Sequence, residues 1–362
     1  MVLYKATKAV ALAAATFSGA QAAEKCTALA MSGGGSKGSY EAGALWGLYF
    51  TDVNATADKY AYDVMTGVSA GALNTACGAM FAPSDVENFI TFLSEKWQEL
   101  KEDNVWVPWK PAGVVTGILK ESGALDTSAL FKFVQSVWDE LGGQIKRKIV
   151  VSCVDASTGA YHLFNETSAD PIKGVVSSAS IPFVFPHQIW GPNTYDNPTD
   201  KNLVCMDGGT VYNTNLVSAV ERCRETVDKD EDITLDIVIC DYNPSLGSWE
   251  DRDSAISNYM RFKDIRDYYD GLADILKFKQ AYPKVNFRYF IEPSEAIASG
   301  LGILNFNNET STYPMQMLGR LDGENAVKSG EGFYFDLMDK WIETPELHAK
   351  YFHVGHYLTE HV

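Results

Sequence analysis

The chain has 362 residues, of which 46% are hydrophobic, 12% aromatic and 21% charged, and its formal net charge is -17. These proportions are those of a folded globular protein and exclude an intrinsically disordered chain, and the length suits one large domain or two small ones. The excess of carboxylates excludes binding to a nucleic-acid backbone, which requires a surface rich in lysine and arginine.

Residues 1–22 have the pattern of a secretory signal peptide. Two lysines precede an apolar run over residues 9–17, and Ala-Gln-Ala at 20–22 provides the small residues that signal peptidase requires before its cleavage site. The apolar run is far shorter than the ~20 residues of a membrane-spanning helix, so we predict cleavage and no transmembrane segment. The sequence therefore predicts a protein of the secretory pathway, extracellular or lumenal, whose mature part is residues 23–362.

From residue 26 onward, apolar segments typical of strands alternate with amphipathic segments typical of helices. We predict strands at residues 26–31, 62–65, 148–154, 203–206, 233–240 and 286–291. We predict helices at residues 37–50, 70–80, 83–100, 128–141, 217–224 and 256–280. This alternation is typical of a three-layer α/β/α fold with a largely parallel central sheet. No segment has the composition of a linker, so we predict one domain over residues 23–362.

The cysteines and sequons bear on the compartment and on covalent links. Asn54, Asn165 and Asn308 begin N-glycosylation sequons, which agree with a secreted glycoprotein. The six cysteines form no closely spaced metal-binding pattern: Cys26, Cys77, Cys153, Cys205, Cys223 and Cys240. Because a core of this size needs no covalent staple, we expect mainly buried thiols and at most one disulfide.

A glycine-rich loop, Gly33-Gly34-Gly35-Ser36-Lys37-Gly38, lies between the first predicted strand and the first predicted helix. Backbone N–H groups at a helix N-terminus attract anions, so this loop is a candidate oxyanion hole or phosphate cradle. Two other interpretations stay open at this point. One is a plain strand-to-helix turn, and the other is a dinucleotide-binding fingerprint with Asp52 or Asp58 as its acidic partner.

A second cluster, Gly67-Val68-Ser69-Ala70-Gly71, follows the predicted strand at 62–65 and precedes the predicted helix at 70–80. A serine flanked by glycines in a strand-turn-helix context is typical of a nucleophile elbow, in which a strained turn exposes the serine hydroxyl. The N–H group of Ala70 then points toward the same space. Ser69 is therefore a candidate nucleophile, and the alternative is a structural turn.

A serine nucleophile needs a base, and two kinds of residue are candidates. An α/β-hydrolase would use a histidine late in the chain, and His353 or His356 would fill that position. Asp207 is the other candidate, since a predicted strand delivers it to a strand end where Gly208 and Gly209 let the backbone turn away. An Asp-Gly pair is also an ordinary turn, so Asp207 taken alone does not decide the choice.

In these segments the chain resembles the patatin-like phospholipase family. The glycine-rich loop is similar to its oxyanion loop, the cluster around Ser69 to its nucleophile elbow, and Asp207-Gly208-Gly209 to its catalytic-aspartate motif. A fourth block, residues 177–186, is similar to the small-residue and proline segment that precedes that aspartate. The four blocks stand in the family's order and cover about residues 26–216.

The resemblance implies a lipid acyl hydrolase of phospholipase A type that works by a Ser-Asp dyad, without histidine, metal or cofactor. Ser69 would be the nucleophile and Asp207 the base, with an acyl-enzyme on Ser69 as the intermediate. The backbone of the loop and of Ala70 would form the oxyanion hole. Two positions depart from the family's pattern: Ser32 stands where aspartate is often found, and Lys37 where arginine is common. Lysine keeps the positive charge but lacks the planar fork of arginine.

The expected partner is a phospholipid or another acyl lipid, met at a membrane or micelle surface. Because the chain is strongly acidic, contact would use local apolar segments, for which residues 105–109, 112–119 and 183–185 are candidates. Two other function classes stay open: an α/β-hydrolase-type esterase with a C-terminal histidine, and a noncatalytic lipid-binding or storage protein of the same fold. A nucleotide-binding protein is a more distant alternative.

Overall fold

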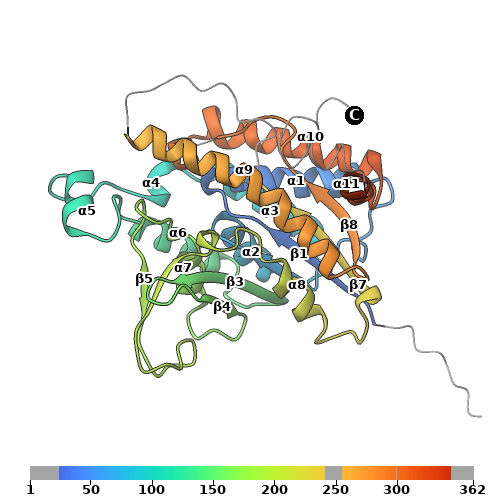
Figure 1. Ribbon diagram of the computed structural model, residues 1–362, viewed down its shortest axis with the longest axis horizontal. Helices are drawn as coiled ribbons and strands as arrows, with labels where there is room; N and C mark the ends of the chain where they lie inside the picture. Colours follow the sequence, from blue (N-terminus) through green and yellow to red (C-terminus); the bar gives the residue numbers. More distant parts are fainter. Residues whose placement is uncertain (1–23, 241–254, 299, 344–362) are drawn as a thin grey trace, which may run out of the picture.

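The structure is a computed structural model that describes residues 24–240, 255–298 and 300–343. The predicted signal peptide and the C-terminal histidines His348, His353, His356 and His361 lie outside these residues. Figure 1 shows the sheet in the middle of the molecule with helices on both of its faces.

Eight strands of the described residues form one central sheet. They are β1 (Cys26–Met31), β2 (Val64–Gly67), β3 (Lys148–Asp155), β4 (Tyr161–Asn165), β5 (Gln188–Trp190), β6 (Leu203–Asp207), β7 (Ile233–Val238) and β8 (Asn286–Ile291). The strand order is β5-β6-β3-β2-β1-β7-β8, and β4 also pairs with β3. The pairs among β3, β2, β1, β7 and β8 are parallel. Strands β4, β5 and β6 pair antiparallel, so the largely parallel sheet is confirmed and has an antiparallel part.

The helices of the described residues cover the two faces of this sheet. They are α1 (Gly38–Thr51), α2 (Ala70–Ala79), α3 (Val86–Glu99), α4 (Glu102–Val105), α5 (Val114–Lys120), α6 (Ser128–Glu140), α7 (Pro171–Ser178), α8 (Leu216–Cys223), α9 (Ala255–Ala281), α10 (Tyr313–Ser329) and α11 (Phe333–Glu343). Successive β1 side chains point to opposite faces. Leu29 and Met31 pack in the core that includes residues of α1, α2, α3, α6 and α10. Ala28 and Ala30 pack in the core that includes residues of α8, α9 and α11, so the three-layer α/β/α fold is confirmed.

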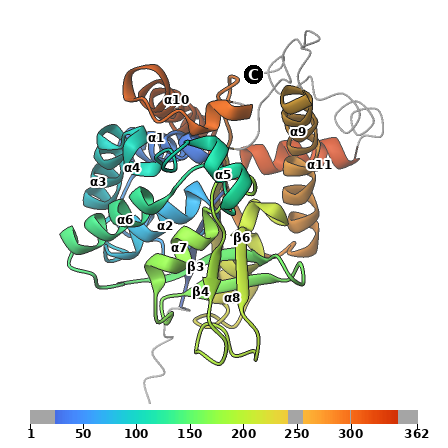
Figure 2. The ribbon, with the colours of Figure 1, turned by 90° about the vertical axis from the view of Figure 1, so that its left-hand side faces the viewer.

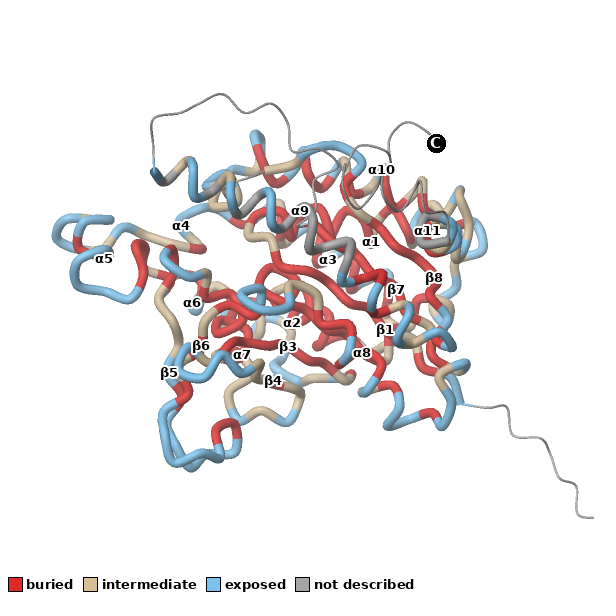
Figure 3. The backbone as a smooth tube through the Cα atoms, in the orientation of Figure 1, coloured by how far each residue is buried: buried red, intermediate tan, exposed pale blue. Residues whose placement is uncertain are grey.

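Several elements were not predicted, namely β4, β5, α4, α5, α7, α10 and α11. One of them, α5, stands away from the body of the molecule (Figure 1). The parallel strands β1, β2, β3, β7 and β8 are buried almost throughout, whereas α5 is largely exposed (Figure 3). Within the described residues, no helix combines the length and the apolar character needed to cross a bilayer.

The structure contains two disulfides, so the expectation of at most one is wrong. Cys26 at the start of β1 is joined to Cys223 at the end of α8, and Cys153 of β3 is joined to Cys205 of β6. Cys77 is a free, buried thiol, as expected. The pairs escaped prediction because sequence spacing does not show which strands lie side by side.

Candidate active site

The glycine-rich loop connects the end of β1 to α1 through a short 3-10 turn, Gly35–Lys37. Gly35 has a φ of 60°, a region that favours glycine. A Cβ on Gly34 would lie 2.6 Å from the Cys240 sulfur, so the backbone here passes too close to its neighbour for a side chain. The loop therefore depends on glycine for conformation at one position and for space at another.

Three N–H groups of this loop are used inside the protein. The N–H of Gly33 donates to the Asn213 carbonyl at 3.0 Å, and that of Lys37 to the Gly34 carbonyl at 3.2 Å. The N–H of Gly38 donates to the carbonyls of Gly35 and Ser36. These bonds of Gly33, Lys37 and Gly38 shape the loop, and the place of the three residues in the oxyanion hole stays a prediction.

Four other backbone N–H groups, three in the loop and one at the elbow, have no hydrogen-bond acceptor within the described residues. The N–H groups of Gly34, Gly35, Ser36 and Ala70 make no hydrogen bond to any residue in the described ranges. Ala70 is the first residue of α2, and Gly35 and Ser36 begin the turn that leads into α1, so these groups lie at helix N-termini. They remain candidate donors to an oxyanion.

Ser69 lies in a strained turn between β2 and α2. Its φ of 53° and ψ of -115° are rare for a residue with a side chain, and such conformations cost roughly 1–3 kcal/mol each. The flanking glycines make the turn sterically feasible, since a Cβ on Gly67 would lie 2.0 Å from the Gly71 carbonyl oxygen. The N–H of Gly71 donates to the Ser32 carbonyl at 3.0 Å, which fixes the elbow to the end of β1. This is the geometry of a nucleophile elbow.

The pairing of β3 brings Asp207 to the same place. A strand has two edges, and β4 occupies one of them along residues 150–154 of β3. Strand β2 pairs with residues 148–151 and β6 with residues 153–155, so both must occupy the other edge, one after the other. Because β2 is parallel to β3 and β6 antiparallel, the C-terminal ends of β2 and β6 face each other. Ser69 follows one of these ends and Asp207 forms the other.

Close contacts agree with this arrangement. A Cβ on Gly208 would lie 3.0 Å from a methyl carbon of Val68, and a Cβ on Gly33 would lie 2.9 Å from the Ser69 Cβ. Asp207 is buried, and its Oδ1 accepts a hydrogen bond of 2.7 Å from the N–H of Gly209. The structure therefore gathers the loop, the elbow and the aspartate motif around one point.

A sequence comparison agrees with the grouping of these motifs. A family model described as patatin-like phospholipase matches residues 29–220, more than half of the chain. The chain belongs to this family. Its members are lipid hydrolases as a class, and all the motifs described above lie within the matched residues.

Comparisons with individual proteins give weaker similarity. VipD from Legionella pneumophila aligns over 85% of this chain and 67% of its own, with 13% identity and a TM-score of 0.39. The heterodimeric complex ExoU-SpcU from the type III secretion system of Pseudomonas aeruginosa provides a chain that aligns over 85% of this chain and 52% of its own, with 14% identity and a TM-score of 0.32. This chain thus spans about half of the latter. No curated protein sequence matches it.

Two residues that hold the motifs together were not predicted. The Asn213 amide donates to the Gly33 carbonyl at 3.0 Å, and its side-chain oxygen fills the space that a Cβ on Gly33 or Gly209 would need. The Ser178 hydroxyl accepts a hydrogen bond of 3.0 Å from the N–H of Ser69. Ser178 lies in the small-residue block at 177–186, and this contact is a physical reason for a small polar residue there.

A buried carboxylate lies beneath the loop, close to the position where the family often has aspartate. Glu41 of α1 is fully buried and accepts hydrogen bonds from the N–H of Ser32 at 2.9 Å and from the Asn74 amide at 2.8 Å. The Ser32 hydroxyl in turn accepts the N–H of Cys240 at 2.8 Å. Ser32 and Glu41 together thus link β1, α1 and α2 below the loop.

Tyr161 of β4 interacts with the Asp207 carboxylate. Burial raises the pKa of Tyr161, the hydrogen bond from the Ser152 hydroxyl lowers it in part, and the Asp207 carboxylate raises it further. Tyr161 therefore stays protonated, and its hydroxyl donates to the Tyr212 carbonyl at 3.2 Å. Within the described residues, no group of three or more His, Cys, Asp or Glu side chains is placed to hold a metal ion.

Proposed function

We propose that this protein is a secreted serine hydrolase of phospholipase A type that cleaves acyl esters of phospholipids or related lipids. Ser69 is the nucleophile and Asp207 the base. The observation that carries the proposal is the meeting of β2 and β6 along one edge of β3, which sets a strained serine beside a buried aspartate. Membership of a phospholipase family supports the lipid substrate.

The energetics require proton transfer to accompany attack. An ordinary carboxyl group has a pKa of about 3.9 and an alcohol a value near that of water, about 15.7, so full transfer in advance would be uphill by roughly 12 units or about 16 kcal/mol. Asp207 must therefore accept the Ser69 proton while the oxygen bonds to the ester carbonyl carbon. Negative charge then develops on the carbonyl oxygen and not on the serine.

The loop and the elbow would stabilise that charge. The N–H groups of Gly34, Gly35, Ser36 and Ala70 are the available donors, and the N-terminus of α2 adds a favourable dipole. Removal of one oxyanion donor in a serine hydrolase costs about 100- to 1,000-fold in kcat. Asp207 then gives the proton it took from Ser69 to the oxygen of the departing alcohol. It next takes a proton from water, which attacks the acyl-enzyme, and returns this proton to the Ser69 oxygen as the fatty acid leaves.

Helix α5 and Phe183 offer a surface for contact with lipid. Val114, Val115, Ile118 and Leu119 are 46–75% exposed on one short helix, and Phe183 is 57% exposed. The carbonyls of Phe183 and Val184 accept hydrogen bonds from the N–H groups of Ala124 and Leu125, which tie the loop after α5 to the segment that leads into β5, the strand paired with β6. This apolar surface is therefore connected to the strand that carries Asp207 (Figure 2). Val105 is buried in the core, so the prediction that it faces lipid is wrong for this residue.

Secretion and glycosylation are part of the same proposal. Two disulfides support an oxidising compartment, because such bonds persist in secreted proteins and are rare in the cytosol. Asn54 is exposed, as an acceptor for N-glycosylation must be. Treatment of the protein from a eukaryotic secretory host with an N-glycosidase would lower its mass if Asn54, Asn165 or Asn308 carries a glycan.

The test of the activity is fatty-acid release from phosphatidylcholine vesicles without added metal, compared among wild type, Ser69→Ala and Asp207→Asn. The amide introduced by Asp207→Asn keeps an oxygen that can accept the Gly209 N–H, so the fold is retained while the base is lost. Both variants should be inactive. Activity that survives Asp207→Asn but not His353→Ala or His356→Ala would support the histidine-dependent esterase. Binding of vesicles without hydrolysis, and no labelling of Ser69 by a fluorophosphonate, would support the storage protein.

A further inference from the structure

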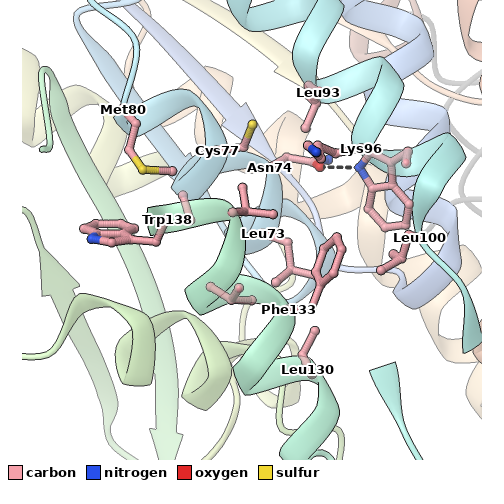
Figure 4. Close-up of a pocket in the computed structure, with 14 residues that line it drawn as sticks. Leu73, Asn74, Cys77, Met80, Leu93, Lys96, Leu100, Leu130, Phe133 and Trp138 are labelled. Carbon is pink, nitrogen blue, oxygen red and sulfur yellow. Dashed lines mark hydrogen bonds between the residues drawn. The ribbon is translucent and has the colours of Figure 1, made fainter. Parts of the chain in front are cut away.

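An apolar cavity of about 50 Å³ lies between α2, α3 and α6 (Figure 4). Leu73 and Met80 line it from the α2 side, Leu93 from α3, and Leu130 and Phe133 from α6. A single buried water needs roughly 10–15 Å³ on the same measure, so the space accepts a group several times larger.

The cavity begins one helical turn beyond the candidate nucleophile. The N–H of Leu73 donates to the Ser69 carbonyl at 3.3 Å, which places Leu73 directly after the elbow. Ala76, Cys77 and Met80 follow Leu73 at three, four and seven residues, so these lining residues share one face of α2. At 1.5 Å per residue, this face extends roughly 16 Å from Ser69 to Met80.

One lining side chain also contacts the glycine-rich loop. A Cβ on Gly38 would lie 2.6 Å from the Trp97 ring, so the indole packs directly against the loop backbone. The Trp97 Nε1 donates to the Asn74 side-chain oxygen at 2.7 Å, and both residues line the cavity. The cavity is thus separated from the oxyanion loop by the thickness of one side chain.

The lining favours a hydrocarbon over a polar ligand. The Asn74 amide donates to the Gly38 carbonyl and to Glu41, so its hydrogen-bonding groups already have protein partners. The Lys96 ammonium pairs with Glu99 at 2.8 Å and Glu140 at 3.0 Å. Burial raises the pKa of Cys77 to about 12, so its thiol is neutral. An apolar cavity of this kind stays dry and binds apolar groups.

We propose that the cavity between α2, α3 and α6 binds the hydrocarbon chain of the acyl group whose carbonyl reacts at Ser69. The inference rests on the proposed function, because the acyl-enzyme on Ser69 puts the first chain carbons at the start of α2. The chain passes Leu73 and extends along the α2 face, where it displaces no polar partner. Chain length is then selected by the depth of the cavity.

Binding is tested without turnover on the full mature Ser69→Ala protein. Its buried Cys77 thiol is modified with methyl methanethiosulfonate and quantified by peptide mass spectrometry, with the same protein without fatty acid as the reference. Palmitate below its micellar concentration should slow modification of Cys77 by roughly tenfold, and octanoate by less, since each lost methylene weakens binding in an apolar pocket. Unchanged modification of Cys77 in saturating palmitate would overturn the proposal, whatever the activity of the wild type.

Chain-length selectivity is tested with variants that change the cavity volume. Ala76→Leu fills the cavity and should lower the ratio of palmitoyl- to octanoyl-ester hydrolysis by roughly tenfold. Phe133→Ala enlarges it and should raise that ratio. Phe131→Ala is the matched control, because Phe131 lies on the same helix but does not line the cavity. Equal ratios in all folded variants would contradict the proposal. If no ester is cleaved, palmitate affinity of the same variants replaces the rate ratio, so failure of the activity is distinguished from failure of the cavity.

Discussion

The Cys153–Cys205 disulfide should support the position of Asp207 as well as the stability of the fold. Cys153 is the register partner of Asp207 in the β3–β6 pair, and Cys205 precedes Asp207 by two residues on the same strand. The other disulfide, Cys26–Cys223, joins the start of β1 to the end of α8, at the opposite end of β1 from the elbow. The two bridges therefore form a matched pair, one beside the candidate site and one away from it.

The stability effect can be worked out from the lengths of the two closed loops. The sequence separation is 52 residues for Cys153–Cys205 and 197 residues for Cys26–Cys223. On the chain-entropy model, a loop of 52 residues corresponds to about 4 kcal/mol at 25 °C and one of 197 residues to about 5 kcal/mol. Replacing both cysteines of a pair by alanine should therefore lower the free energy of unfolding somewhat more for Cys26–Cys223.

Activity should follow the opposite order. Loss of the Cys153–Cys205 bridge frees the strand end that carries Asp207, and a displacement of about 1 Å in a catalytic group costs on the order of 100-fold in rate. We expect a fall in kcat of roughly 10- to 100-fold for Cys153→Ala/Cys205→Ala and an unchanged kcat for Cys26→Ala/Cys223→Ala. The assay is fatty-acid release at a temperature where circular dichroism shows both variants folded, with urea titration for stability.

The outcome that refutes this reasoning is a kcat that follows stability. If the variant without Cys26–Cys223 loses as much kcat as the other while both are folded, the effect of either bridge is general. If the variant without Cys153–Cys205 keeps the wild-type kcat, Asp207 is held in place without the bridge, by strand pairing and by the hydrogen bond of 2.9 Å from its N–H to the Ser180 carbonyl among its other contacts.

Three further predictions concern the surface, the core and the response to acid. Replacing Val115, Ile118 and Leu119 by serine should weaken binding to phosphatidylcholine vesicles by roughly tenfold or more in a flotation assay, because their exposed apolar area is lost. Hydrolysis of a soluble short-chain ester by this triple variant should not change. The control Val53→Ser, which alters an exposed valine far from α5 in the sequence, should change neither vesicle binding nor ester hydrolysis. Vesicle binding by the triple variant equal to that of wild type would contradict a role for α5. Asp236→Ala should lower the free energy of unfolding, measured by urea titration, by about 3–5 kcal/mol, because it leaves the buried guanidinium of Arg288 without its carboxylate. Asp274→Ala, at the exposed pair with Lys277, is the control and should have little effect. Similar small losses of stability in both variants would refute the argument. Burial raises the pKa of Asp52, but hydrogen bonds from Lys59, Asn54 and Tyr60 outweigh it and hold that pKa below the ordinary 3.8. Asp52 therefore contributes stability that is present above the unfolded-state pKa of 3.8 and is lost as pH falls through the lower folded-state value. The difference in unfolding free energy between wild type and Asp52→Asn should shrink on acidification below about pH 4. A constant difference across that window would show that the pairing does not act through ionisation.

Local patterns were sufficient to predict the elements that carry the nucleophile. A strand, two glycines around a serine and a helix are all contiguous in the sequence, so the elbow at Ser69 follows from short-range sterics. Helix α10 shows the opposite case. Its interior contains Gly319 and Gly323, which weaken a helical pattern in the sequence, yet a Cβ on Gly319 would lie 2.1 Å from the Tyr40 carbonyl oxygen of α1. The glycines serve close packing of two helices, which no local rule shows.

The residues that connect the motifs were not predictable for a related reason. Asn213, Ser178 and Glu41 act through contacts with residues that lie 180, 109 and 9 positions away in the sequence. An asparagine in a loop, a serine at a helix end and a glutamate in a helix are each common in a surface setting. Their importance depends on which segments are neighbours in the fold. The sequence predicts β6 as a strand but does not predict whether it runs parallel or antiparallel to β3.

The antiparallel direction of β6 explains why two residues suffice for the proposed chemistry. In an all-parallel sheet, residues that follow adjacent strands emerge side by side along one edge of the sheet, and a relay residue on a loop must complete the path from acid to nucleophile. Here β2 and β6 approach each other along the same edge of β3, so their terminal residues converge from opposite directions. In the proposed mechanism, the carboxylate then takes the serine proton without an intervening imidazole. The same geometry confines the candidate site, because Asn213 and the glycines of two motifs fill the space between the strand ends.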